Sequence, residues 1–123
     1  MTVLVAHLPT KESAAAIRAG AAEARRRQED LVVFELGDGA ASTEASVSSA
    51  VADAEPGVPV RFESRDPRQP DAAGALLDAA NHHDASVIVI GVRHRSPTGK
   101  LLFGSLAQEI LLGAPMPVLA VKP

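Results

Sequence analysis

The segment 91–105 (GVRHRSPTGKLLFGS) brings together the residue types that bind anions. Its three glycines let the backbone turn tightly and approach a ligand closely. It also carries three basic residues with no carboxylate before Glu109: Arg93, Arg95 and Lys100. Gly104 and Ser105 then open a predicted helix, whose free N–H groups and positive dipole end attract anions. The segment therefore predicts a phosphate-binding loop.

This segment matches neither of the common phosphate-binding fingerprints. A P-loop needs Ser or Thr after its Gly-Lys pair and a glycine five positions before it. Here Gly99-Lys100 is followed by Leu101, and the preceding glycine is Gly91. No G-x-G-x-x-G turn follows the first predicted strand. On composition alone, a basic surface loop with structural glycines fits the segment equally well.

Other reactive side chains give no catalytic or metal site. Ser105 lacks the G-x-S-x-G elbow and an assignable base, so we interpret it as a helix-capping and phosphate-binding residue. His82 and His83 are adjacent and point about 100° apart on a helix, which suits a helix end better than a metal. His7 and His94 follow strands expected to be neighbours. With no third ligand evident, we expect both to line the ligand pocket.

The elements that position these residues follow from hydrophobic patterning. Apolar runs predict buried strands, and small apolar residues at helical spacing predict helices between them. The predicted strands are Val3–His7, Asp30–Leu36, Val58–Glu63, Ser86–Ile90 and Val118–Val121. The predicted helices start with the N-cap Thr10, near Thr43, near Asp71 and at Ser105. Pro59 cannot donate to a ladder, which places the third strand at a sheet edge. Residues 92–103 are expected to form a long loop.

The regular alternation of strand and helix predicts an α/β fold with a doubly wound, mostly parallel sheet. In such sheets ligands bind at the carboxyl ends of the strands, where the strand order reverses. The strand ends are residues 7–10, 36–38 and 91 onward. We expect the whole chain, residues 1–123, to form a single domain.

Composition narrows the class of function. The chain has 123 residues, 46% of them apolar, which excludes two full-sized domains. A formal net charge of −3 and 2% aromatic residues argue against a nucleic-acid partner. Zero cysteines exclude disulfides and thiolate chemistry. No apolar stretch approaches the ~20 residues of a membrane span and no signal-peptide pattern is visible, so we expect a cytoplasmic protein without a membrane partner.

Nearly the whole chain resembles a single-domain, UspA-like universal stress protein. That family's pattern of Gly, two residues, Gly, nine residues, Gly and Ser or Thr is kept in spacing by Gly91, His94, Gly104 and Ser105. Further segments that align in order are 3–24, 31–36 and 114–121. The resemblance implies a Rossmann-like fold of the adenine nucleotide alpha hydrolase type, with five parallel strands in the order 3-2-1-4-5.

The resemblance also implies an adenine-nucleotide site for ATP or AMP, with Mg²⁺ as a companion of the nucleotide. Two positions depart from the family pattern. Leu8 stands where an Asp that contacts the nucleoside is typical, and His94 replaces the second glycine. A histidine crowds close backbone approach but can itself meet a phosphate. The predicted nucleotide-binding residues are Ala6, His7, Leu8, Leu36, Ile90, Gly91, Arg93, His94, Lys100, Gly104, Ser105 and Leu106.

The function that the resemblance implies is a stress-response regulator that binds ATP or AMP as a homodimer. The partner copies would pair through Val118–Val121, and an apolar edge strand at the chain end favours such pairing. The alternative is a dimeric stress or interaction protein that binds no nucleotide. No base or positioned water is identifiable, so catalysis is not predicted, and at most slow ATP hydrolysis is implied by the resemblance.

Overall fold

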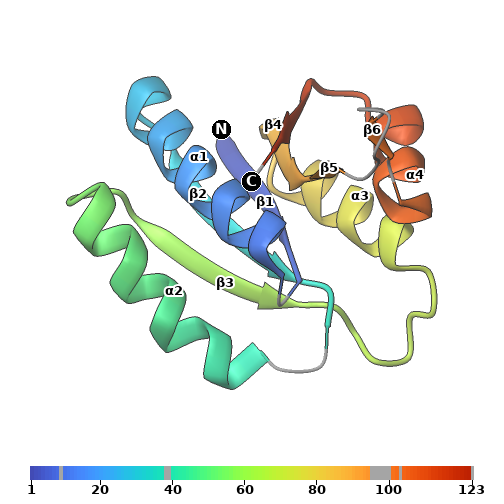
Figure 1. Cartoon of the computed structure of the whole chain (residues 1–123), viewed down its shortest axis with the longest axis horizontal. Coiled ribbons are helices and arrows are strands. Elements are labelled where there is room, and N and C mark those ends of the chain that lie inside the picture. The colour runs from blue at the N-terminus through green and yellow to red at the C-terminus, as the bar shows by residue number, and fades with distance from the viewer. Residues whose placement is uncertain (9, 38–39, 95–100, 103, 123) are drawn as a thin grey trace.

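The computed structural model describes residues 1–8, 10–37, 40–94, 101–102 and 104–122 (Figure 1). The strands are β1 (Thr2–His7), β2 (Asp30–Glu35), β3 (Val60–Ser64), β4 (Ala85–Gly91), β5 (Arg93–His94), β6 (Leu101–Leu102) and β7 (Val118–Val121). The helices are α1 (Lys11–Arg27), α2 (Ala40–Ala54), α3 (Ala72–His82) and α4 (Ser105–Gly113). The predicted elements are all present, and α2 begins three residues earlier than predicted.

The main sheet has five strands in the order β3-β2-β1-β4-β7, and every pair in it is parallel. This confirms the predicted doubly wound fold and strand order. β3 lies at one edge, as Pro59 indicated, and the Pro59 carbonyl accepts the Leu31 N–H at 2.9 Å. The Rossmann-like order places the carboxyl ends of β1 and β4 side by side.

The prediction of an irregular loop over residues 92–103 was wrong at its two ends. Arg93 pairs with Leu102 and His94 with Leu101 as the antiparallel strands β5 and β6. Each strand has only two residues, too few to produce a periodic hydrophobic signal. The connection 95–100 lies outside the described residues.

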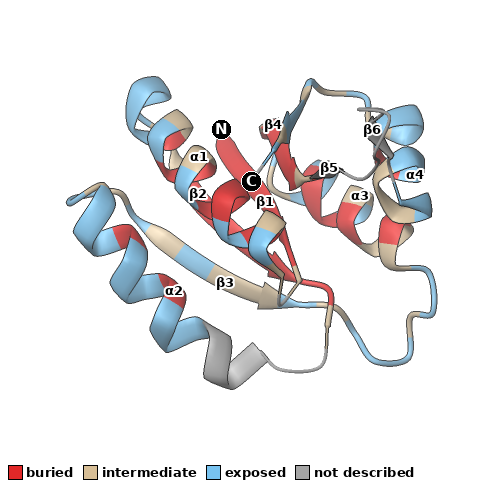
Figure 2. Cartoon of the chain, viewed as in Figure 1, coloured by how far each residue is buried: buried red, intermediate tan, exposed pale blue. Residues whose placement is uncertain are grey.

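Two helices cover each face of the sheet (Figure 1). Along β1, Val3 and Val5 pack with α1 and α2, whereas Leu4 and Ala6 pack with α3 and α4. The alternation follows from the strand's two-residue period. All of β1 is buried (Figure 2). This alternation decides which face each residue at the end of β1 reaches.

The turn from β1 into α1 is fixed by side-chain hydrogen bonds. Thr10 is the N-cap of α1, as predicted, and its Oγ1 accepts the Ser13 N–H at 3.2 Å. Ser13 Oγ in turn accepts the Leu8 N–H at 2.9 Å. Capping bonds of this kind satisfy amides that the first helical turn leaves unpaired. The start of α1 is thereby held against the carboxyl end of β1.

Candidate functional site

A small cavity lies at the carboxyl ends of β1 and β4, beside the start of α4. Six of the twelve predicted nucleotide-binding residues line it: Ala6, Leu8, Leu36, Ile90, Gly91 and Leu106. Sequence reasoning missed three further lining residues: Ser13, Ala107 and Ile110. We call this cavity the strand-end crevice. Its walls are aliphatic, and Ser13 supplies the polar side chain of the lining.

The strand-end crevice has a volume of about 40 Å³. One water molecule occupies ~30 Å³ of liquid, whereas pockets for small molecules typically measure about 300–1,000 Å³. A nucleoside cannot be enclosed in a space of this size. A base bound here would lie over the aliphatic residues that rim the crevice.

Gly91 and Gly104 match the resemblance equally, but the structure gives them different environments. A Cβ on Gly91 would lie 2.2 Å from the carbonyl oxygen of Glu12, so the end of β4 meets the first turn of α1 at a distance that only glycine allows. A Cβ on Gly104 would have no heavy atom of the described residues within 4 Å, and φ at Gly104 is −64°. The close contact with Glu12 therefore explains why residue 91 is glycine. No such contact with the described residues explains the glycine at 104.

The amino end of α4 faces this open space without a side-chain cap. Gly104 is the N-cap, and Ser105 is the first helical residue, which corrects the expectation that Ser105 caps the helix. No acidic residue stands in the first turn. The first N–H groups of a helix lack partners within the helix and carry its positive partial charge. Exposed Ser105 and half-buried Leu106 thus sit where an anion would meet free amides.

Three predicted phosphate contacts are not tested by this geometry. Arg93 and His94 form β5, directly beyond β4, but only their backbone is described. Lys100 lies outside the described residues.

His7 points away from the strand-end crevice. The alternation of β1 places it on the face covered by α1 and α2, where it is 7% exposed. Its Nδ1 lies 2.5 Å from Oε2 of Glu35, the residue opposite it in β2. The tautomer of the imidazole decides which of the two atoms donates. The other oxygen, Oε1, accepts the Gly37 N–H at 2.9 Å.

Sequence reasoning missed Glu35, which is 4% exposed. The available signal was its position as the last residue of the second strand, opposite the last residue of the first. The buried carboxylate satisfies its two oxygens with His7 and Gly37, so it holds the imidazole in place.

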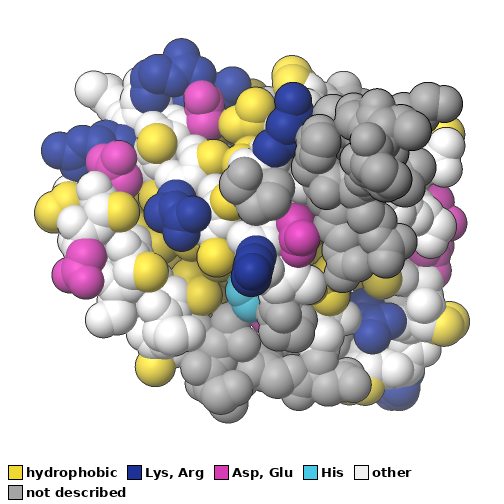
Figure 3. Space-filling view, viewed as in Figure 1, with side chains coloured by type: hydrophobic (Ala, Val, Ile, Leu, Met, Phe, Trp, Pro, Cys, Tyr) yellow, Lys and Arg dark blue, Asp and Glu magenta, His cyan; other side chains and the backbone are white. Residues whose placement is uncertain are grey.

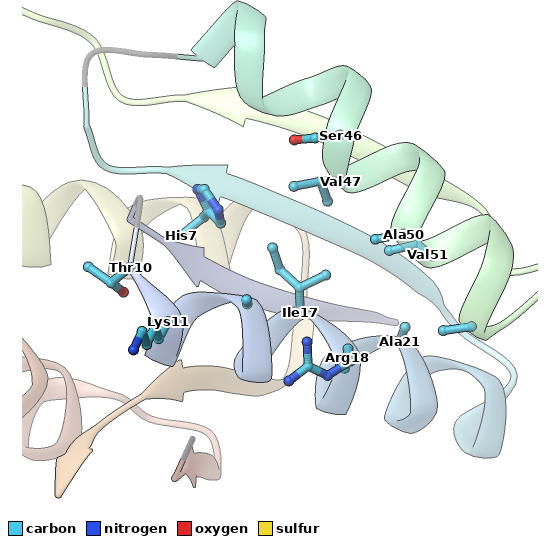
Figure 4. A pocket seen from close by; sticks show the side chains of 12 residues that line it. His7, Thr10, Lys11, Ile17, Arg18, Ala21, Ser46, Val47, Ala50 and Val51 are labelled. Atoms are coloured by element: carbon cyan, nitrogen blue, oxygen red, sulfur yellow. The ribbon is translucent and has the colours of Figure 1, made fainter.

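A much larger cavity, of about 560 Å³, opens between α1 and α2 (Figure 4). We call it the interhelix slot. It is lined by His7, Thr10, Lys11, Ala14, Ile17, Arg18, Ala21, Ser46, Val47, Ala50, Val51 and Ala54. On this face of the molecule, basic side chains lie around exposed apolar side chains (Figure 3). Among the predicted site residues whose side chains are described, His7 is the one that lines the slot.

Glu23 and Asp66 have shifted pKa values, and neither lines the strand-end crevice or the interhelix slot. Hydrogen bonds from Arg27 and Arg26 lower the pKa of Glu23, and the backbone N–H of Arg68 lowers that of Asp66. Within the described residues, no group of three or more His, Asp or Glu side chains could hold a metal ion. The described part of the chain thus offers hydrophobic contact and anion-attracting groups.

Comparisons with known proteins agree on one family. The pattern of the universal stress protein family matches residues 1–122. A universal stress protein from Mycolicibacterium smegmatis is 47% identical over 116 residues, covering 89% of this chain and 88% of that protein. The structure of a universal stress protein from Archaeoglobus fulgidus superposes with a TM-score of 0.83 at 30% identity, covering 99% of this chain and 98% of that one. A structure of the Archaeoglobus fulgidus universal stress protein in complex with dAMP gives 0.78 at 25% identity, with the same coverage.

Proposed function

This chain belongs to the universal stress protein family, and on that premise we propose that it binds an adenine nucleotide, ATP or AMP, across the strand-end crevice. The Archaeoglobus fulgidus relative described in complex with dAMP supports an adenine nucleotide as the ligand class. The stress-response role belongs to the same proposal.

The observation that carries the proposal is the open backbone at the start of α4. Among the described residues, nothing fills the space where a Gly104 side chain would be and no side-chain group caps the helix, and no carboxylate stands in the first turn. A phosphate placed there would accept hydrogen bonds from the amides of the first turn and from the Ser105 hydroxyl. Arg93, His94 and Lys100 would add positive charge around the same phosphate.

The base would be held by hydrophobic contact over Leu36, Ile90 and Leu106. Leu8 supplies more apolar surface but no hydrogen bond to the nucleoside, since it stands where the family typically has Asp. We therefore expect phosphate to dominate recognition, and adenosine to bind much more weakly than AMP. The described residues hold no cluster for a metal, so Mg²⁺ would accompany ATP through its phosphates.

Calorimetric titration with ATP and AMP, with and without Mg²⁺, tests the proposal. The wild type should bind, and Gly104→Val and Lys100→Glu should abolish binding. Because φ at Gly104 is ordinary and its surroundings are open, Gly104→Val should leave the chain folded, which a thermal melt checks. No binding of the wild type at millimolar nucleotide would refute the proposal.

The same proposal includes a homodimer that pairs β7 with its copy in a second chain. β7 is the last strand of the sheet, and Leu119 on it is 37% exposed. An unpaired apolar edge strand is a template for pairing with another chain. Light scattering after size exclusion should give twice the chain mass, and a monomer at micromolar concentration would contradict the pairing.

The second candidate function is a dimeric interaction protein that binds no nucleotide. The 40 Å³ volume of the strand-end crevice favours it. A dimer in light scattering together with silent ATP and AMP titrations would select this alternative. No helix among the described residues is long and apolar enough to cross a membrane. A cytoplasmic location is part of the proposal, and cell fractionation tests it.

A further inference from the structure

We propose that the interhelix slot is a second ligand site, which binds an aliphatic carboxylate of the medium-chain fatty acid class. The slot lies on the opposite face of the sheet from the apolar residues of the strand-end crevice. It shares no lining residue with that crevice. The inference is therefore independent of nucleotide binding.

The slot has the size and length of a site for an extended chain. Its volume of about 560 Å³ lies within the ~300–1,000 Å³ of pockets that take small molecules. Its lining on α1 runs from Thr10 to Ala21, which spans roughly 16 Å at 1.5 Å per residue. His7, held by Glu35, lies at the Thr10 end (Figure 4).

The interior of the slot is aliphatic. Ile17, Val47 and Val51 are buried in the floor between the helices. Small residues on both helices leave room for the slot: Ala14 on α1 and Ala50 on α2 are both exposed, and both line it. No Phe, Tyr or Trp is among the described residues that line the slot, and its one aromatic ring is the His7 imidazole, which Glu35 holds at one end. The walls offer aliphatic area, which a methylene chain can cover.

The positive charges on the rim of the slot favour an anionic ligand. Lys11 and Arg18 line the slot seven residues apart, on one face of α1. Neither forms an ion pair or hydrogen bond with the described part of the chain, and none of the described lining residues is a carboxylate.

The other arginines of α1 provide a contrast. They are all paired with glutamates: Arg25 with Glu55, and Arg26 and Arg27 with Glu23. Two unpaired cations beside an apolar slot fit a ligand that combines one negative group with an aliphatic body.

The two ends of the slot differ in polarity. Three of the slot's polar residues, His7, Thr10 and Lys11, lie at the end where the amino terminus of α1 adds a positive partial charge. The opposite end, at Ala21 and Ala54, is apolar. The carboxylate therefore lies by Lys11 with Arg18 along the rim, and the chain runs toward Ala21.

The test is calorimetric titration of the full chain with butyrate, octanoate and decanoate, each below its micelle concentration. Burial of apolar surface predicts about fourfold tighter binding for each added methylene until the slot is full. Decanol, which has the same chain without the charge, should bind roughly threefold to tenfold more weakly than decanoate. No binding of decanoate, or equal binding of butyrate and decanoate, would overturn the proposal.

Two pairs of variants locate the binding. Ala14→Leu combined with Ala50→Leu fills the slot and should abolish decanoate binding, whereas Ala22→Leu, an exposed alanine of α1 outside the slot, should not. Lys11→Glu combined with Arg18→Glu should weaken binding at least tenfold, whereas the same charge reversal at exposed Arg68 should not.

The variant results decide between this site and other modes of binding. Equal loss in target and control variants would show nonspecific adsorption and refute the site. Displacement of decanoate by saturating ATP in the wild type would place the fatty acid in the strand-end crevice and also refute it. All the substituted positions are exposed, so we expect every variant to fold. A thermal melt of each variant checks this.

Discussion

Gly91→Ala should separate the role of this glycine in packing from its role in the nucleotide pattern. An added Cβ would lie 2.2 Å from the carbonyl oxygen of Glu12 and 2.3 Å from its carbonyl carbon. These are backbone atoms of the first turn of α1, so no side-chain rotation can relieve the contact. The end of β4 and the start of α1 would have to separate by about 1 Å to restore ordinary contact distances.

The cost of this separation should fall at the upper end of the overpacking range, about 3 kcal/mol. For a chain of 123 residues that corresponds to a melting temperature lower by roughly 12 °C, at about 4 °C per kcal/mol. With no Trp or Tyr in the chain, urea and thermal unfolding are best followed by far-UV circular dichroism.

The matched control is Gly104→Ala. Here the added Cβ has no atom of the described residues within 4 Å. The lower entropy of the unfolded chain offsets the poorer N-cap, so stability should change by no more than about 0.5 kcal/mol. If Gly91→Ala is as stable as Gly104→Ala, packing against Glu12 does not require glycine, and the residue must be explained by the ligand instead.

Three other substitutions test the His7–Glu35 pair, the ion pairs of Glu23 and the strand-end crevice. Glu35→Ala leaves buried His7 Nδ1 unpaired and should cost about 1–3 kcal/mol in urea unfolding, and a smaller loss would show that the imidazole finds another partner. Glu23→Gln should cost no more than about 1 kcal/mol at neutral pH. Since Arg27 and Arg26 lower the pKa of Glu23, the stabilisation is present above the ordinary carboxyl pKa and should be lost as the pH falls from there through the lowered pKa of Glu23. A difference that persists at still lower pH would contradict this origin. Leu8→Asp supplies the acceptor that the crevice lacks and should tighten AMP binding about threefold to tenfold in calorimetry, whereas unchanged affinity would show that the carboxylate is not what limits binding.

The strands and their order could be predicted because the signals were long and mutually consistent. β1, β2 and β4 are continuous apolar runs that are buried on both faces, and the helices between them are one-sided. Pro59 correctly indicated an edge strand because its chemistry excludes one side of a ladder. The hairpin of β5 and β6 could not be predicted, because two residues per strand carry no period.

The lining residues of the strand-end crevice could be predicted where they lie at the ends of the predicted strands. Ala6, Leu8, Leu36 and Ile90 come together because the carboxyl ends of parallel strands meet at one edge of the sheet. The pairing of His7 with Glu35 depends on the register between β1 and β2, which local patterns do not determine. The interhelix slot arises from alanines, which look like ordinary helix-forming residues in the sequence and leave space only when two helices face each other.

The end of β1 shows why these two cavities need separate explanations. Ala6 and Leu8 face the crevice, and His7 between them faces the slot, because neighbouring residues of a strand point to opposite faces. The capping residues of α1 divide in the same way: Ser13 lines the crevice and Thr10 lines the slot. A single turn of chain thus forms one wall of each cavity, although their linings share no residue. A nucleotide bound at α4 would leave the slot empty. The slot's volume, and the two rim cations that have no partner in the described part of the chain, are the observations that our proposal of a second ligand explains.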